Sequence, residues 1–200
     1  MTGRKATIVL LAAGGSVRMG RPKQLLPFKG KTLVRHAASE AIAANLGTVV
    51  VVTGEMDPLI RESLAGLQVS YAYNPDWQKG IASSIVTGIR AALTPPPGPD
   101  AVLLMVADQP AVTEGLLKKI WLNWKESGKP IAASVYDNQA GTPALFAASL
   151  FQELLQLEGD TGAKRILKKY QEELCLLAFP EGGLDIDTPN DYELLKQAME

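Results

Sequence analysis

Short runs of apolar, often β-branched residues alternate along the chain with longer stretches of helical spacing. The apolar runs predict strands over 6–12, 48–53, 69–73, 101–107, 131–136 and 174–179. The stretches between them predict helices over 32–45, 57–66, 81–93, 114–126, 147–157, 161–172 and 189–199. Strands that alternate with helices are typical of a mostly parallel sheet with helices on both faces. The runs are continuously apolar, which also indicates strands that are covered on both sides.

This pattern favours a three-layer α/β/α fold with a doubly wound sheet, formed by residues 1–200 as one domain. No repeat of fixed period and no low-complexity tract divides the sequence. The proline-rich connection TPPPGPD at 94–100 precedes a predicted strand, so we interpret it as a surface loop. Because ligands of such sheets bind beyond the carboxyl ends of the strands, the residues that follow each apolar run are the first candidates for a site.

Composition and charge narrow the class of protein. Twenty basic residues oppose twenty-one acidic ones, which gives a formal net charge of -1 and argues against a general nucleic-acid binder. No apolar stretch approaches the ~18 residues of a membrane-spanning helix. The first apolar run superficially resembles a secretory leader, but it is short and basic residues follow it, so a buried strand explains it better. The single cysteine, Cys175, lies in an apolar run and predicts a buried, inert thiol in a reducing, cytoplasmic compartment.

The stretch LLAAGGSVRMGRPKQLLPF, residues 10–28, joins a glycine pair to unopposed positive charge. A P-loop is excluded because Arg21 and Pro22 stand where its Lys and Ser or Thr belong, and Ser16 breaks the Rossmann glycine pattern. Two interpretations stay open on physical grounds. Gly14 and Gly15 let the backbone approach phosphates, with Arg18 and Lys23 adding charge, or the stretch is a plain glycine turn with solvated bases.

The sequence also resembles a known family. LAAGGSVRMGRPKQLLPFKGKTLV is similar to the nucleotidyltransferase signature L-A-A-G-x-S-x-R-M-G-x-x-K-x-L-L-P-x-x-G-x-x-L, and most of all to molybdenum cofactor cytidylyltransferases and guanylyltransferases. NPDWQKGIASSIVTGI, VADQP, GTPALF, LEGDTGAKRIL and DIDTPNDY resemble the later blocks of that family in order. The resemblance implies a Rossmann-like fold of the nucleotide-diphospho-sugar transferase type and Mg²⁺-dependent transfer of a nucleoside monophosphate.

The resemblance assigns roles to individual residues. It implies catalytic roles for Lys23, Arg18 and Asp108, and Mg²⁺ ligands at Asp108 and Asp187. It implies nucleotide contacts from Leu11, Ala12, Ala13, Gly14, Gly15, Ser16, Arg18, Lys23, Asn74, Gly80, Ser83, Ser84 and Asp108. A carboxylate at the end of a buried strand suits Mg²⁺, although Asp108 could also begin a turn. Ser83 and Ser84 could equally be helix caps, and Thr188, Pro189 and Asp191 have the pattern of a helix start.

The acceptor side follows from the same resemblance. It implies acceptor contacts from Gln109, Gly141, Thr142 and Pro143, but relatives often carry His where this chain has Thr142, which leaves the acceptor open. Nucleotidyl transfer works by positioning and charge neutralisation, so it requires no protein nucleophile. Accordingly, we interpret His36, the sole histidine, as a packing or surface residue.

These expectations lead to one predicted function and its rivals. We expect transfer of CMP from CTP to the phosphate of molybdopterin with release of pyrophosphate, because Ala12-Ala13-Gly14 resembles members that use CTP in preference to GTP. A guanylyltransferase for the same pterin, a sugar- or polyol-phosphate nucleotidyltransferase and a catalytically idle insertion chaperone are the alternatives. The expected partners are CTP or GTP, the pterin phosphate and, transiently, a molybdenum hydroxylase, with no nucleic acid and no membrane.

Overall fold

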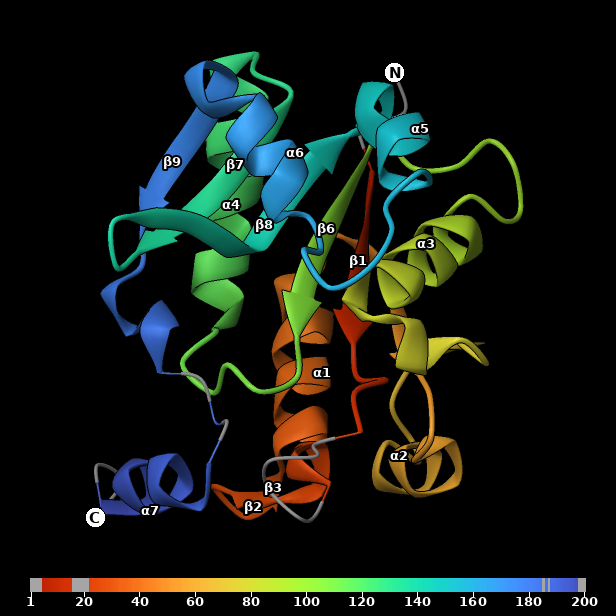
Figure 1. The fold of residues 1–200 in the computed structure, drawn as a ribbon, viewed down its shortest axis with the longest axis vertical. Coiled ribbons are helices and arrows are strands. Elements are labelled where there is room, and N and C mark those ends of the chain that lie inside the picture. Colours follow the sequence, from red (N-terminus) through yellow and green to blue (C-terminus); the bar gives the residue numbers. More distant parts are fainter. Residues whose placement is uncertain (1–4, 16–21, 185, 187, 198–200) are drawn as a thin grey trace.

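A seven-stranded sheet forms the centre of the protein, with strand order β5-β4-β1-β6-β8-β7-β9 (Figure 1). The structure, a computed structural model, describes residues 5–15, 22–184, 186 and 188–197, and only the backbone at 189, 194, 196 and 197. The strands are β1 (Ala6–Leu11), β4 (Gly47–Thr53), β5 (Ser70–Tyr73), β6 (Ala101–Val106), β7 (Ile131–Tyr136), β8 (Gln139–Ala147) and β9 (Leu174–Ala178). All neighbouring pairs are parallel except the two that β8 makes, with β6 and with β7.

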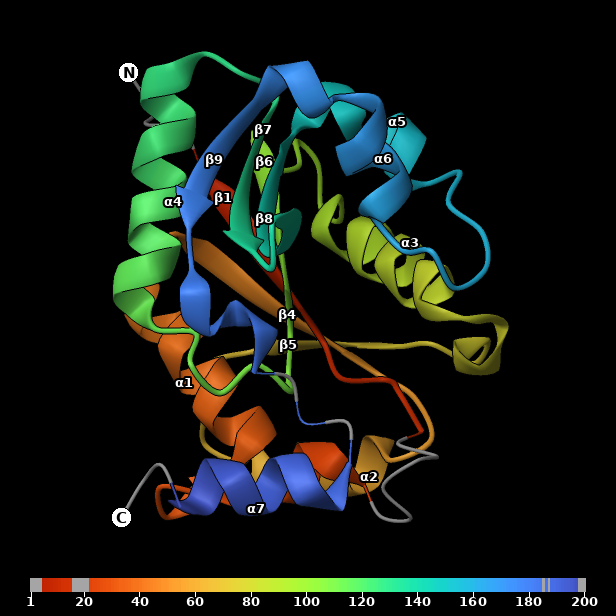
Figure 2. The same cartoon turned by 60° about the vertical axis from the view of Figure 1, so that its left-hand side comes forward.

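Helices cover both faces of this sheet, as Figures 1 and 2 show. One face packs against α1 (Leu33–Ala44), α2 (Asp57–Ser63) and α4 (Glu114–Ser127), and the other against α3 (Ile81–Ala92), α5 (Phe151–Leu154) and α6 (Lys164–Lys169). Side chains of β1 alternate between the two cores: Ile8 and Leu10 enter the first, and Val9 and Leu11 the second. The expected three-layer, mostly parallel α/β fold is therefore confirmed.

A third, smaller cluster joins the last helix to the segment that follows the glycine pair. The hairpin of β2 (Pro27–Phe28) and β3 (Lys31–Thr32) lies beside α7 (Pro189–Gln197) in Figure 2. Leu26, Phe28, Leu33, Ile186 and Tyr192 form its buried core. The Tyr192 hydroxyl donates a hydrogen bond to the Pro27 carbonyl at 2.7 Å. The C-terminal segment is thereby held at the same end of the molecule as the residues after β1.

The start of α7 has the capping geometry that its sequence predicts. The Thr188 N–H donates to Asp191 Oδ2 at 2.7 Å, and the Asp191 N–H donates to Thr188 Oγ1 at 3.3 Å. This reciprocal pair satisfies two N–H groups that a helix start leaves without partners. Among the described residues, short 3-10 turns occur at Lys23–Leu25, Trp77–Lys79, Ala148–Leu150, Gln171–Glu173 and Pro180–Gly183.

The six predicted strands are present, but the region after β7 differs from the expectation. Residues 139–147 form β8, an antiparallel strand that the sequence pattern did not predict. The helix expected over 147–157 is a 3-10 turn followed by the four residues of α5, and the one expected over 161–172 contains only the six residues of α6. The sequence of β8 does not indicate a strand, because Gly141 and Pro143 both have low strand propensity. Pairing with β6 and β7 stabilises the strand despite this.

The edge strand β9 also departs from the expectation of full coverage. Its residues alternate between covered and exposed, and Leu176 is 54% exposed. Cys175 lies on this strand, half-buried rather than fully buried, with its Sγ 3.8 Å from the Asn123 carbonyl oxygen. Within the described ranges, the helices are too short or too polar to cross a membrane.

Truncation of neighbouring leucines tests the two-sided burial of the central sheet. Leu103 and Leu104 are adjacent on β6 and are 0% and 1% exposed, in opposite cores. Both Leu103→Ala and Leu104→Ala are expected to lower the free energy of unfolding by about 2–5 kcal/mol, because each leaves a cavity. The control Leu176→Ala on the exposed side of β9 is expected to cost under about 1 kcal/mol. Urea denaturation measures all three, and a small cost at either β6 position would contradict burial on both faces.

Candidate active site

The carboxyl ends of β1 and β6 meet at one point of the sheet edge. The two strands are paired in register, with Leu11 opposite Val106, so the chain leaves both strands at the same level. The Ala107 N–H continues the ladder to the Leu11 carbonyl at 3.2 Å. β4 flanks β1 on its other side, so the chain reverses its direction of winding here. Ligands of open α/β sheets bind at such a reversal.

A pocket of about 340 Å³ opens at this point. It is lined by residues for which the sequence predicts nucleotide contacts: Leu11, Ala13, Gly14, Gly15, Lys23, Gly80, Ser84 and Asp108. It is also lined by residues for which sequence reasoning gave no role, namely Gln24, Trp77, Gln78, Ile81, Val106, Ala107 and Asp160. These residues are up to 149 positions apart in the sequence, from Leu11 to Asp160, and the fold brings them around one pocket.

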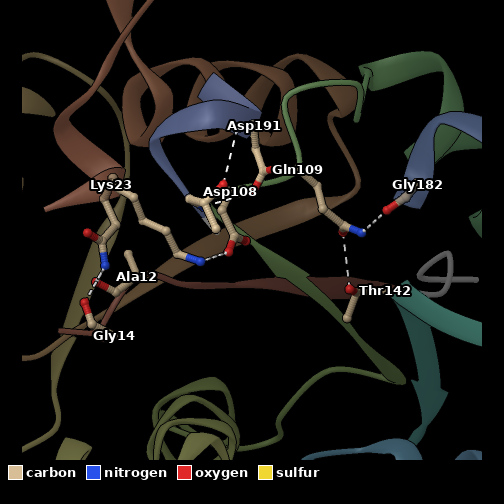
Figure 3. Close-up of polar contacts among 10 residues, drawn as sticks. Ala12, Gly14, Lys23, Asp108, Gln109, Thr142, Gly182 and Asp191 are labelled. Atoms are coloured by element: carbon tan, nitrogen blue, oxygen red, sulfur yellow. Dashed lines mark hydrogen bonds and ion pairs between the residues drawn. The ribbon is translucent and has the colours of Figure 1, made fainter. Parts of the chain in front are cut away.

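Lys23 and Asp108 form an ion pair at the mouth of this pocket. The Lys23 Nζ points to Asp108 Oδ2, and both side chains are 18% exposed (Figure 3). Lys23 begins a 3-10 turn, and Asp108 follows β6 after one residue. The Lys23 ammonium is a group that a phosphate would bind, and the Asp108 carboxylate is a group that a metal ion would bind.

The glycine segment after β1 is held by Gln24, a side chain that sequence reasoning missed. Gln24 is 3% exposed, and its Nε2 donates to the Gly14 carbonyl at 2.5 Å and the Ala12 carbonyl at 3.4 Å. Figure 3 shows these two carbonyls beside Lys23. Because the amide occupies the carbonyl side of the segment, the loop is fixed as a wall of the pocket. The signal in the sequence was limited to a polar residue between Lys23 and the two leucines Leu25 and Leu26.

Trp77 packs directly on two glycines and forms another wall. A Cβ on Gly15 would lie 2.7 Å from Trp77 Cζ3, and a Cβ on Gly54 would lie 3.0 Å from its Cγ and 2.6 Å from the Ala13 carbonyl oxygen. Both glycines therefore serve close packing, since any larger residue would push the indole or the loop away. The indole remains partly exposed at the pocket.

Asn74, Ser83 and Ser84 act together beneath the pocket. Asn74 is 1% exposed, and its Nδ2 donates to Ser83 Oγ at 2.9 Å and Ser84 Oγ at 3.0 Å. The N-cap of α3 is Gly80, with no capping side chain, so the alternative that a serine caps this helix is wrong. Ser84 and Gly80 reach the pocket, whereas Asn74 and Ser83 support them from behind.

The expected acceptor residues form a separate network beside Asp108. Gln109 is 3% exposed, and its Nε2 donates to the Gly182 carbonyl at 2.9 Å and reaches the Tyr136 hydroxyl at 3.3 Å. Its Oε1 accepts from Thr142 Oγ1 at 3.1 Å, as Figure 3 shows. Gly141 leaves room for Tyr136, whose hydroxyl would collide with a Cβ there. The buried amide of Gln109 thus holds the Thr142 hydroxyl in place.

Pro143 follows Thr142 on β8 and is buried, with its carbonyl accepting from Ser134 Oγ at 2.9 Å. Three further expectations, for Ser16, Arg18 and Asp187, lie outside the described residues. Ile186, which precedes Asp187 in the sequence, donates its N–H to the Asp108 carbonyl at 3.4 Å. The C-terminal segment therefore reaches the candidate metal aspartate through its backbone.

A larger cavity, of about 1020 Å³, lies at the opposite edge of the sheet. It is formed by the amino-terminal ends of β1, β4 and β5 and by the proline-rich loop at 94–99. Neither Lys23 nor Asp108 lines it. Because ligands bind at the carboxyl ends in this type of sheet, we assign the chemistry to the smaller pocket.

His36 supports the Asp108 turn from α1. Its Nε2 lies 3.1 Å from the Pro110 carbonyl oxygen, which can only accept, so the nitrogen carries the proton. Phe28 contacts the ring edge-on at a centroid distance of 4.8 Å. Burial is the largest influence on His36 and lowers its pKa below the ordinary value of 6.5, outweighing the Pro110 hydrogen bond that raises it. The sequence interpretation of a packing residue agrees with this position.

The lowered pKa of His36 predicts acid sensitivity. His36 takes up a proton more readily in the unfolded protein than in the folded one. Its contribution to the free energy of unfolding is therefore fully present above pH 6.5 and is lost as the pH falls through the lowered pKa of the folded state. His36→Gln removes this titration while keeping a donor for Pro110. Urea denaturation at about pH 7.5 and about pH 5.5 is expected to show a smaller acid loss for the variant than for the wild type. Equal losses would mean that His36 is not buried as described.

Comparison with known proteins places this geometry in a family. The chain is 32% identical to the purine catabolism protein PucB of Bacillus subtilis, over 96% of each chain. It is 30% identical to the nicotine blue oxidoreductase of Paenarthrobacter nicotinovorans, over 94% of this chain and 96% of the other. It is 25% identical to the molybdenum cofactor cytidylyltransferase of Escherichia coli, over 94% of each.

Solved structures agree with these relatives. Rv0371c from Mycobacterium tuberculosis superposes with a TM-score of 0.83 at 28% identity, covering 98% of this chain and 100% of that one. A second structure of that protein, a complex with manganese, has a TM-score of 0.79 at 27% identity, covering 97% and 99%. The family model described as a MobA-like NTP transferase domain matches residues 8–174. The chain therefore belongs to the MobA-like NTP transferase family and is a nucleotidyltransferase.

Proposed function

We propose that the chain, acting over residues 1–200 as one domain, transfers CMP from CTP to the phosphate of molybdopterin and releases pyrophosphate. The observation that carries the proposal is the Lys23–Asp108 ion pair, which joins the glycine segment to the end of β6 beside the pocket. The similarity to the E. coli molybdenum cofactor cytidylyltransferase supports the choice of acceptor.

The proposed reaction exchanges one phosphorus–oxygen bond for another. An oxygen of the pterin phosphate attacks the α-phosphorus of CTP, and the bond from that phosphorus to the oxygen bridging the β-phosphate breaks. The electron pair leaves with pyrophosphate, so no protein nucleophile is needed. Lys23 offsets the negative charge of the triphosphate as the two anions approach, and the backbone after β1 orients the nucleotide.

Mg²⁺ fits the residues at this site. Asp108 offers a partly exposed carboxylate at the pocket, and Mg²⁺ commonly takes one or two carboxylates and fills its shell with phosphate oxygens and water. In the described part of the chain, no cluster of three or more His, Cys, Asp or Glu could hold a metal alone, which suits an ion shared with substrate. We propose Asp108 and Asp187 as its ligands. When bound, the ion supplies charge neutralisation at the phosphates.

The remaining nucleotide and acceptor assignments belong to the same proposal. Ser16 and Arg18 would contact the triphosphate, and the resemblance of Ala12-Ala13-Gly14 to family members that use CTP supports CTP over GTP. Gln109 would hold Thr142 toward the pterin. A molybdenum hydroxylase is the expected recipient of the product, and the balanced net charge of -1 gives no support to nucleic-acid binding.

A second candidate activity is an oxidoreduction, since the nicotine blue oxidoreductase is 30% identical to this chain. Product analysis separates the candidates. With CTP, Mg²⁺ and molybdopterin, the proposed function requires pyrophosphate and a cytidine dinucleotide of the pterin. Products from GTP or from sugar phosphates would indicate the rival transferases. Oxidation or reduction of nicotine blue would indicate the oxidoreductase, and binding without turnover would indicate a chaperone.

Neutral variants of the ion pair test the proposed mechanism. Lys23→Met and Asp108→Asn are each expected to lower the rate of pyrophosphate release by at least about 100-fold, because charge is lost where the transition state needs it. The matched controls are Lys118→Met and Glu114→Gln, which remove an exposed ion pair of 3.0 Å on α4. Steady-state kinetics with a pyrophosphate-coupled assay measures all four. A rate within a few-fold of wild type for either pocket variant would refute the assigned roles.

A further inference from the structure

The sequence block LEGDTGAKRIL contributes to the pocket, although the proposed reaction gives none of its residues a role. The chain between α5 and α6, residues 155–163, runs beside α3 in Figures 1 and 2. Within it, Asp160 lines the same pocket as Lys23 and Asp108. A carboxylate on the wall of a pocket for a polyanion requires an explanation, because it repels phosphate.

One hydrogen bond and two close approaches at glycines place this acidic turn, residues 158–162, against α3. The Ala82 N–H donates to the Gly159 carbonyl at 3.1 Å. Gly80 has a φ of 101°, and a Cβ there would collide with Asp160 Oδ1. Gly162 has a φ of 55°, and a Cβ on it would lie 3.0 Å from Ile81 Cγ2. Glycine at 80 and 162 therefore permits the acidic turn to pack on the first turn of α3, which sets the carboxylate against the pocket.

The neighbours of Asp160 indicate which part of a nucleotide it would face. On the α3 side, the pocket is lined by Trp77, Gly80, Ile81 and Ser84, which carry no charge. The cation Lys23 and the candidate metal ligand Asp108 belong to the segments after β1 and β6. Triphosphate and metal are favoured beside the charged pair, so the uncharged side is left for the nucleoside. An ionised carboxylate only accepts hydrogen bonds, so its partner must donate one.

We propose, resting on the proposed nucleotidyl transfer, that Asp160 is a specificity-determining residue that accepts a hydrogen bond from the nucleoside part of the bound nucleotide. The donor is an O–H or N–H group, and a nucleoside offers two sources of it: the ribose hydroxyls and the exocyclic amine of cytosine. Asp160 would therefore select nucleotides that present a donor at this position and reject those that present an oxygen acceptor or a hydrogen.

Binding calorimetry on the intact protein tests this role. The probes are CTP, 2′-deoxyCTP, 3′-deoxyCTP and UTP, each with Mg²⁺, titrated into wild type, Asp160→Ala and Asp160→Asn. Asp160→Ala is expected to weaken CTP binding by about 10-fold or more, as for a lost hydrogen bond to a charged group. One analogue lacks the O–H or N–H group that donates to Asp160. For that analogue, the Kd of Asp160→Ala is expected to equal that of wild type. If Asp160→Ala no longer prefers CTP over a deoxy analogue, the donor is a ribose hydroxyl. If it no longer prefers CTP over UTP, the donor is the exocyclic amine of cytosine.

The matched control is Glu158→Ala, which removes an exposed acid two residues away that does not line the pocket. It is expected to bind every probe like wild type, and thermal melting checks that all variants remain folded. Unchanged CTP affinity in Asp160→Ala, an equal change for all four probes, or an effect confined to the acceptor KM would each overturn the inference.

Failure of the proposed function gives a different result. A wild-type protein that binds no nucleotide overturns both proposals. If nucleotides bind and Asp160→Ala loses discrimination, but CMP is transferred to a different acceptor, the acceptor assignment fails while the role of Asp160 stands. If molybdopterin is the acceptor and the variant discriminates like wild type, only the inference about Asp160 fails.

Discussion

The site depends on the in-register pairing of β1 with β6. This pairing ends both strands at the same level, so the glycine segment that follows β1 and the Asp108 turn that follows β6 emerge together. Lys23 then meets Asp108 at this end of the sheet. A slip of one residue in a strand pair would turn the following side chains to the opposite face and separate this cation from its carboxylate. The central strands are buried on both faces, and such burial specifies the register strongly.

Close packing around the pocket depends on glycines that serve different purposes. Gly15 and Gly54 make room for the indole of Trp77, and Gly80 makes room for the acidic turn at 158–162. Gln24 supports the same pocket wall from behind by binding carbonyls that water would otherwise solvate. The walls are therefore closely packed and come from separate segments, which suits catalysis by positioning and charge rather than by a covalent intermediate.

Much of the fold could be predicted from the sequence, because continuous apolar runs and helical spacing are local signals. The same is true of the glycine segment and Asp108, which come directly after such runs. β8 was not predicted, because its pairing with β6 and β7 overrides the weak strand propensity of Gly141 and Pro143. The roles of Gln24 and Asp160 were not predicted for another reason. Gln24 contacts the Gly14 carbonyl and Asp160 lies against the first turn of α3, and both neighbours are known only from the three-dimensional structure. Gln109 was recognised, but its burial beneath Thr142 was not.

We propose that a nucleoside triphosphate and a divalent metal bind at the Lys23–Asp108 contact. A crystal structure of the protein with CTP and Mn²⁺, with the manganese located by its anomalous scattering, tests this most directly. We expect a manganese peak at the Asp108 carboxylate, the Lys23 amine turned from Asp108 to a phosphate oxygen, and the cytidine among Ala13, Gly80 and Ser84. Manganese and nucleotide bound elsewhere, with the ion pair intact, would contradict it.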